Sequence, residues 1–156
     1  ANDNCPGQVV ISGEESGLNK VEEHLSDAGA RKVVRLAVSI ASHSPLMTQA
    51  QDEFKAILED ALITDPVIPI IGNVRATLLS SVEEIREDLR EQLTSRVRWT
   101  ESINTLTNMG VKTYYELGPG KVLTGLMRRI DRSNTSYPID APTSISLILS
   151  EMPSTS

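Results

Sequence analysis

Short apolar segments alternate along this chain with stretches in which apolar residues recur every three or four positions. The first pattern is typical of buried β-strands and the second of amphipathic α-helices. The strand-like segments lie at residues 8–13, 32–40, 67–71 and 111–117, and each is followed by helix-like sequence. Strands that alternate with helices predict an α/β layered architecture.

Capping residues predict where several helices begin and end. Ser44 followed by Pro45 fits a helix N-cap and first helical position, and Ser81 with Glu84 forms a capping box. Glycines placed after the last periodic residue end two helices, at Gly29 and Gly110. The apolar stripes expected to face the core are Leu18, Val21, Leu25 and Ala28; Met47, Ala50, Phe54, Leu58 and Ala61; Val82, Ile85, Leu89 and Leu93; and Trp99, Ile103, Leu106 and Met109.

The two ends of the chain differ from its middle. The first residue is not Met, and the opening sequence has neither a signal peptide nor a transit peptide, so we expect a chain that starts inside a structure. From residue 133 onward the sequence is rich in Ser, Thr and Pro. That composition predicts a loose tail with one short helix near residues 145–152.

Composition and charge exclude several classes of function. The 156 residues include 15 Lys and Arg against 21 Asp and Glu, a formal net charge of −6. Nucleic-acid binding needs a basic face, and a membrane helix needs roughly 20 apolar residues in succession, so we expect neither partner. Cys5 is the only cysteine, which excludes an internal disulfide and a zinc cluster of several thiolates and favours a reducing compartment.

One of the two histidines occupies a position suited to catalysis. His24 stands beside Glu22 and Glu23 in a polar helical stretch and is expected to be solvated. His43 follows a strand-like segment and precedes a helix N-terminus, a place where ligands and catalytic groups collect in open α/β sheets. The positive end of that helix favours a neutral imidazole that can accept a proton. Position alone supports equally a histidine that is hydrogen-bonded to its own turn.

No nucleophile accompanies this candidate base. The pentapeptide G-x-S-x-G, which exposes a serine hydroxyl at a strand-to-helix turn, does not occur in the sequence. The segment at residues 118–121, GPGK, lacks the spacing of a phosphate-binding loop. We interpret it as a tight turn between a strand and a helix.

Three segments together resemble the malonyl-CoA:acyl carrier protein transacylases of bacterial-type fatty acid synthesis. They are residues 2–13 (NDNCPGQVVISG), residues 38–47 (VSIASHSPLM) and residues 115–123 (YELGPGKVL). Their order and separation match the C-terminal half of the discrete enzyme, from residue 1 to the start of the tail.

The resemblance implies a ping-pong acyl transfer. In that family a serine from a G-H-S-x-G elbow attacks the malonyl thioester, and a histidine, here His43, acts as its base and later as the acid. Coenzyme A leaves a malonyl ester on the serine, which the phosphopantetheine thiol of acyl carrier protein then attacks. The resemblance also implies that the backbone carbonyl of Arg98 orients the His43 ring and that Asn4 binds substrate in the same cleft. It implies no cofactor and no metal, because the coenzyme A thioester is a substrate.

The same resemblance implies three partners: malonyl-CoA, acyl carrier protein and the missing N-terminal half of the enzyme. The serine elbow and the arginine that binds the malonyl carboxylate fall before residue 1, so we expect no activity from this chain alone. Acyl carrier protein is acidic, and Arg31, Lys32, Arg128 and Arg129 match positions proposed for its dock. Ordinary surface cations are an equal interpretation of each. The implied location is the cytoplasm, or a plastid or mitochondrion in a eukaryote.

The family fold combines an α/β-hydrolase-like large subdomain with a ferredoxin-like small one. By resemblance, residues 1–39 are the later part of the small subdomain. Residues 40–156 belong to the large acyltransferase subdomain, with 133–156 as the loose tail. Both are expected to be incomplete, with open sheet edges and uncovered apolar faces.

Two other interpretations remain open from the sequence. The acyltransferase domains of polyketide and multifunctional fatty acid synthases share the histidine segment, although they usually depart from the forms of the other two segments. A non-catalytic chain that binds carrier protein or a complementary chain is the second interpretation, since it needs no nucleophile.

Overall fold

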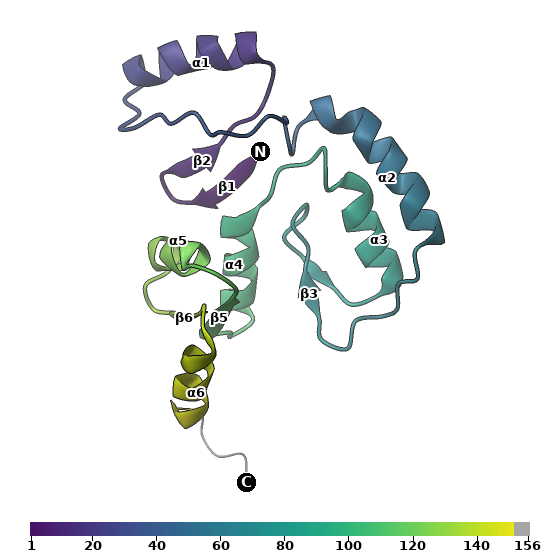
Figure 1. The fold of residues 1–156 in the computed structure, drawn as a ribbon, viewed down its shortest axis with the longest axis vertical. Helices are drawn as coiled ribbons and strands as arrows, with labels where there is room; N and C mark the ends of the chain where they lie inside the picture. Colours follow the sequence, from purple (N-terminus) through teal and green to yellow (C-terminus); the bar gives the residue numbers. More distant parts are fainter. Residues whose placement is uncertain (152–156) are drawn as a thin grey trace. The chain divides into compact units, whose positions relative to one another are not determined.

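A computed structural model describes residues 1–151 as helices and three two-stranded sheets, which confirms the predicted α/β class (Figure 1). The chain divides into two compact units. One contains Ala1–Asn4 and Gln8–Ser102, and the other contains Cys5–Gly7 and the residues from Ile103 on. The subdomain boundary predicted near residue 39 stays a prediction. None of the helices in residues 1–151 has the length and apolar character that crossing a bilayer requires.

The first unit begins with a pair of strands and a helix. Strands β1 (Asn2–Cys5) and β2 (Gln8–Val10) pair with each other, and helix α1 (Glu15–Asp27) follows. The predicted helix end is confirmed, because Gly29 takes a φ of 83°, a left-handed conformation that glycine adopts without strain. The sequence did not predict β1, since its polar residues lack the apolar alternation of a strand.

The strand predicted at residues 32–40 is absent. The segment runs without regular secondary structure between α1 and the next helix (Figure 1). Its apolar side chains are exposed: Val33, Val34, Leu36, Val38 and Ile40. A β-strand needs a neighbouring strand for its backbone hydrogen bonds, and none of the described strands pairs with this segment.

The rest of the first unit is built around two packed helices. A short 3₁₀ helix, η1 (Pro45–Met47), leads into α2 (Thr48–Asp60), and α2 lies beside α3 (Val82–Glu91) (Figure 1). The predicted caps are confirmed: at the start of η1 the Ser44 hydroxyl accepts a hydrogen bond from the Leu46 N–H, and α3 begins with the Ser81 capping box.

A short hairpin lies between these two helices in the chain. Strand β3 (Ile70–Ile71) pairs antiparallel with β4 (Leu78–Leu79), which the sequence did not predict. The strand predicted over residues 67–71 is shorter than expected and begins only at Ile70. The reason is that Pro69 has no N–H to donate to a neighbouring strand.

The second unit is organised on a parallel strand pair. Helix α4 (Trp99–Asn108) leads into it, and β5 (Thr113–Leu117) pairs with β6 (Thr135–Ile139), from Thr113 opposite Thr135 to Leu117 opposite Ile139. Helix α5 (Val122–Ile130) connects the two strands, as a parallel pair requires. Most of the predicted α4 stripe turns inward, but Met109 is exposed and lies outside the helix.

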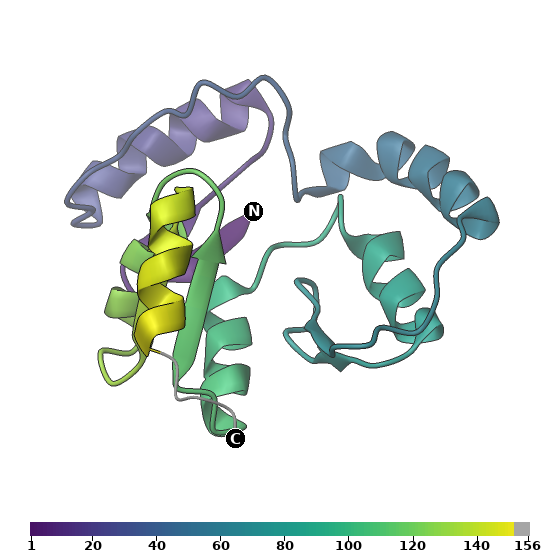
Figure 2. The same ribbon diagram turned by 60° about the horizontal axis from the view of Figure 1, so that its bottom comes forward.

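The predicted loose tail is wrong for much of its length. Residues 135–139 form β6, and α6 (Pro142–Glu151) packs against that strand (Figure 2). The Ser, Thr and Pro content gave no indication of this strand, which forms because it can pair with the edge of β5. Pro138 is tolerated because β6 has an unpaired edge of its own among the described strands. The short helix predicted near residues 145–152 is confirmed by α6 over the described residues, and residue 152 lies outside them.

Glu116 in β5 caps the helix that follows. The N-cap residue of α5, Lys121, makes no side-chain capping bond. The Glu116 carboxylate instead accepts hydrogen bonds from the N–H groups of Leu123 (2.9 Å) and Thr124 (2.7 Å). Burial by itself would raise the pKa of Glu116, but these hydrogen bonds outweigh it and hold the pKa below its ordinary value of 4.5.

We expect Glu116→Gln to lower the free energy of unfolding by about 1 kcal/mol at pH 7, as the loss of a helix cap does. Because the folded-state pKa is lowered, this stabilisation is present above the unfolded value and disappears as the pH falls through the folded value. Urea unfolding of both proteins between pH 7 and pH 3 measures the effect. A difference that stays constant across this range would contradict the assignment.

Candidate active site

The His43 ring is held through one nitrogen. Nδ1 lies 3.0 Å from the carbonyl oxygen of Gln92 and 3.2 Å from that of Ser95. Carbonyl oxygens only accept hydrogen bonds, so Nδ1 carries the proton. Both hydrogen bonds that the ring makes to residues 1–151 use Nδ1. Nε2 therefore carries no proton and has a lone pair for proton transfer.

The backbone of His43 is strained and is held in place by a hydrogen bond. Its φ of 59° is in the left-handed region, which costs a non-glycine residue on the order of 1 kcal/mol and persists only when the surroundings hold it. The His43 N–H donates to the carbonyl of Leu93 at 3.0 Å. Three carbonyls from residues 92–95 therefore fix both the backbone and the ring.

His43 borders a hollow and is not enclosed in a hydrophobic core. The half-buried ring lines a hollow of about 760 Å³ in the first unit. Asn2 and Ser12 contribute polar groups to the wall, and the exposed apolar side chains of residues 33–40 form much of the rest. The Ser12 hydroxyl donates to the carbonyl of Ser42 at 2.6 Å, which ties β2's end to the residue before His43.

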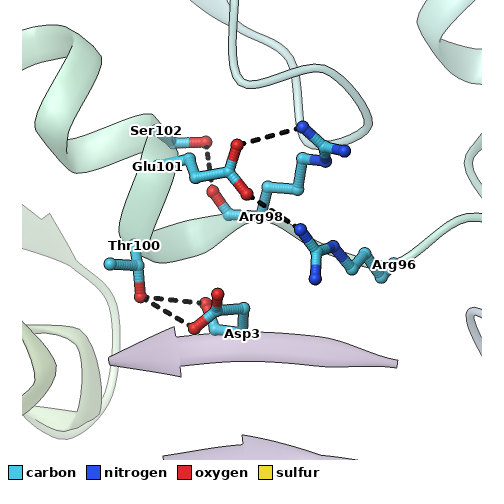
Figure 3. Close-up of polar contacts among 6 residues, drawn as sticks. All are labelled: Asp3, Arg96, Arg98, Thr100, Glu101 and Ser102. Carbon is cyan, nitrogen blue, oxygen red and sulfur yellow. Dashed lines mark hydrogen bonds and ion pairs between the residues drawn. The ribbon is translucent and has the colours of Figure 1, made fainter. Parts of the chain in front are cut away.

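The predicted role of Arg98 is wrong. Its carbonyl oxygen accepts the N–H and the hydroxyl of Ser102, both at 2.9 Å (Figure 3). Among the described residues, the hydrogen bonds of the His43 ring are instead with Gln92 and Ser95. The physical reason is that Arg98 directly precedes α4, so its carbonyl accepts the first hydrogen bond of that helix. Gln92 and Ser95 supply the carbonyls that orient the ring.

The segment that carries these carbonyls is anchored at its C-terminal end. Val97 exchanges two backbone hydrogen bonds with the first residues of the chain: its carbonyl accepts the Asp3 N–H of β1 (2.9 Å), and its N–H donates to the carbonyl of Ala1 (2.7 Å). The Glu101 carboxylate lies between the guanidinium groups of Arg96 and Arg98, at 3.0 Å from each (Figure 3). These contacts anchor residues 96–98 to the start of the chain and to the first turn of α4.

Comparisons with known proteins decide the relationship. No family model matches the chain. A malonyl CoA-acyl carrier protein transacylase of Bacillus subtilis is 42% identical over 149 residues, which cover 96% of this chain and 47% of that protein. The solved structure of a malonyl-CoA:acyl carrier protein transacylase from Xanthomonas oryzae superimposes with a TM-score of 0.92 at 38% identity, over 96% of this chain and 48% of the other. This chain is related to the malonyl CoA-acyl carrier protein transacylases.

A second solved structure extends the comparison. It is described as a type II PKS acyl-carrier protein in complex with its malonyl-transacylase, and it matches with a TM-score of 0.94 at 38% identity, over 97% of this chain and 49% of that one. The resemblance predicted from the three segments is confirmed. The chain spans about half the length of the curated transacylases it matches.

The remaining predicted site residues are placed as follows. Asn4 is half-buried in β1 and does not line the hollow beside His43, whereas Asn2 does. Arg31 and Lys32 are exposed in the first unit. Arg128 and Arg129 are exposed in the last turn of α5, where cations also favour the helix dipole. Arg129 donates to the carbonyl of Pro6 at 3.1 Å, so part of its role is structural.

Sequence reasoning missed the groups that hold the His43 ring. The carbonyls of Gln92 and Ser95 are backbone atoms, so no residue type signals them. The Gln51 side chain bonds to the Leu89 carbonyl and the Leu93 N–H, next to Gln92. It could have been noticed, because it is a polar residue at the helical spacing of Met47 and Phe54 and is 2% exposed. A glutamine inside an apolar stripe was the signal that could have found it.

Proposed function

We propose that this chain supplies the base-bearing half of a malonyl-CoA:acyl carrier protein acyltransferase site, and that a serine outside these 156 residues supplies the nucleophile. The observation that carries the proposal is the His43 ring, held by carbonyls at Nδ1, with Nε2 available beside an open hollow. The relationship to the transacylases supports it. Fatty acid biosynthesis in the cytoplasm, or in a plastid or mitochondrion, is the proposed setting.

In the proposed reaction, Nε2 of neutral His43 takes the serine hydroxyl proton while the serine oxygen attacks the thioester carbonyl of malonyl-CoA. The carbon–sulfur bond breaks, and the proton passes from His43 to the departing coenzyme A thiolate. The carrier protein's phosphopantetheine thiol then gives its proton to His43 and attacks the malonyl ester. When the carbon–oxygen bond breaks, His43 returns the proton to serine. The Gln92 and Ser95 carbonyls stabilise the imidazolium that forms in each half of the cycle.

Substrate and partner roles complete the proposal. Asn4, or Asn2 at the hollow itself, binds the acyl group, and no cofactor takes part. Arg31, Lys32, Arg128 and Arg129 dock the acidic carrier protein. The exposed apolar segment of residues 33–40 is covered by the N-terminal half of the enzyme, which would complete a ferredoxin-like small subdomain and a hydrolase-like large one.

The test is an acylation assay with labelled malonyl-CoA. We expect the chain alone to retain no label, and the chain mixed with a separately expressed, serine-bearing N-terminal half of a related transacylase to retain label and pass it to carrier protein. The control is the N-terminal half alone. If the mixture forms a complex that retains no label, the non-catalytic binding interpretation is favoured over the enzyme.

A further inference from the structure

We infer that Gln51 is a positioning residue for His43 and acts through one peptide group, the unit that joins Gln92 to Leu93. The inference deepens the proposed function and rests on it for the catalytic consequence. Its structural part stands on the geometry of the described residues. Gln51 lies in the first turn of α2, eight positions after His43 in the sequence.

Both ends of the buried Gln51 side-chain amide are hydrogen-bonded. Its exposed fraction is 2%, the largest side chain among the described residues that is so completely enclosed. Its Nε2 donates to the carbonyl of Leu89 at 3.2 Å, and its Oε1 accepts the N–H of Leu93 at 2.7 Å. A buried amide is costly unless both of its ends find partners, and here both partners are backbone atoms at the end of α3.

The same peptide group contacts both side chains. Its N–H, on Leu93, donates to Gln51, and its C=O, on Gln92, accepts the proton of His43 Nδ1 at 3.0 Å. A peptide unit is planar and rigid, so fixing the direction of the N–H also fixes the direction of the C=O. Hydrogen bonds in such a chain also polarise one another, which strengthens the acceptor that faces the imidazole.

The next carbonyl along the chain extends the effect to the backbone. The carbonyl of Leu93 accepts the His43 N–H at 3.0 Å, where the residue is held at its left-handed φ of 59°. Gln51 therefore braces the segment that fixes both the ring and the strained backbone of His43. A glutamine that only filled space between α2 and α3 would have no such connection.

Two variants and a control separate the roles. Gln51→Met keeps the approximate volume but removes both hydrogen bonds, and Gln51→Glu keeps an acceptor for the Leu93 N–H. Leu58→Ala, near the other end of α2, also weakens the packing between the helices but removes none of the hydrogen bonds that Gln51 and His43 make. Each is measured in the full chain completed with the serine-bearing half.

The readouts are the imidazole nitrogen signals of His24 and His43, with the isotope label in this chain only, and the steady-state constants. In the unsubstituted protein we expect His43 to be a single Nδ1–H tautomer. Gln51→Met is expected to give a mixture of tautomers at His43, no change at His24, and a kcat about tenfold lower with an unchanged KM for malonyl-CoA. Gln51→Glu is expected to restore the single tautomer and most of kcat, and Leu58→Ala to leave the tautomer unchanged.

The outcomes distinguish the two proposals. If Gln51→Met leaves the His43 signals as they were, the inference is overturned, whatever happens to kcat. If Gln51→Met does not fold, Gln51→Glu decides, because a carboxylate accepts more strongly and must shift the Leu93 amide and His43 Nδ1 proton signals; unchanged signals overturn the inference. If the His43 tautomer responds but no form of the protein transfers the malonyl group, the positioning role holds and the proposed function fails.

Discussion

The variant His43→Asn is expected to lower malonyl transfer by about 10³-fold or more in the completed enzyme, because the step then has no group to take the serine proton. Asparagine is the substitution of choice because it tolerates the left-handed backbone, with φ at 59°, better than alanine does. The half-buried ring contributes little to the core, so the midpoint of thermal unfolding should change by only a few degrees. Transfer of labelled malonyl to carrier protein and thermal unfolding measure the two effects.

A matched control is available because the chain contains two histidines. His24 is exposed in α1 and its ring contacts only the carbonyl of Lys20 among the described residues. His24→Asn should leave transfer unchanged. Transfer by His43→Asn within tenfold of the unsubstituted enzyme would exclude His43 as the base. A tenfold change in rate corresponds to about 1.4 kcal/mol of activation free energy, which is too small for the loss of the proton acceptor.

Charge reversal at Arg128 is expected to weaken the use of carrier protein. With Arg128→Glu we expect kcat/KM for carrier protein to fall about tenfold at low salt and less at high salt, because exposed charges are screened. Acylation by malonyl-CoA should be unaffected. Arg128 is preferred to Arg129 as the test, since Arg129 also holds the carbonyl of Pro6.

Lys55→Glu provides the same change of charge on α2, where Lys55 is exposed and paired with Asp52. If Lys55→Glu lowers kcat/KM as much as Arg128→Glu does, the effect reflects the net charge of the chain and the dock is elsewhere. Rates measured over a series of salt concentrations separate the two cases.

Local signals predicted the helices well. The capping box at Ser81, the cap at Ser44 and the stop at Gly29 are contacts between residues close in the sequence, so the residues themselves carry the information. The strands were predicted less well. Residues 32–40 have the composition of a strand but no partner, and residues 135–139 have the composition of a loop but pair with β5. Strand formation depends on a neighbour that the local sequence does not specify.

The sequence by itself determined the relationship to the transacylases and singled out His43, because both depend on residue types and their spacing. Only the tertiary structure decided which groups hold the histidine. Arg98 was expected to do so, but its carbonyl is used by α4, while Gln92 and Ser95 present theirs. Every residue has a backbone carbonyl, so the residue type does not show which carbonyls face the histidine. The directions of the Gln92 and Ser95 carbonyls follow from how α3, Gln51 and the turn after α3 are packed.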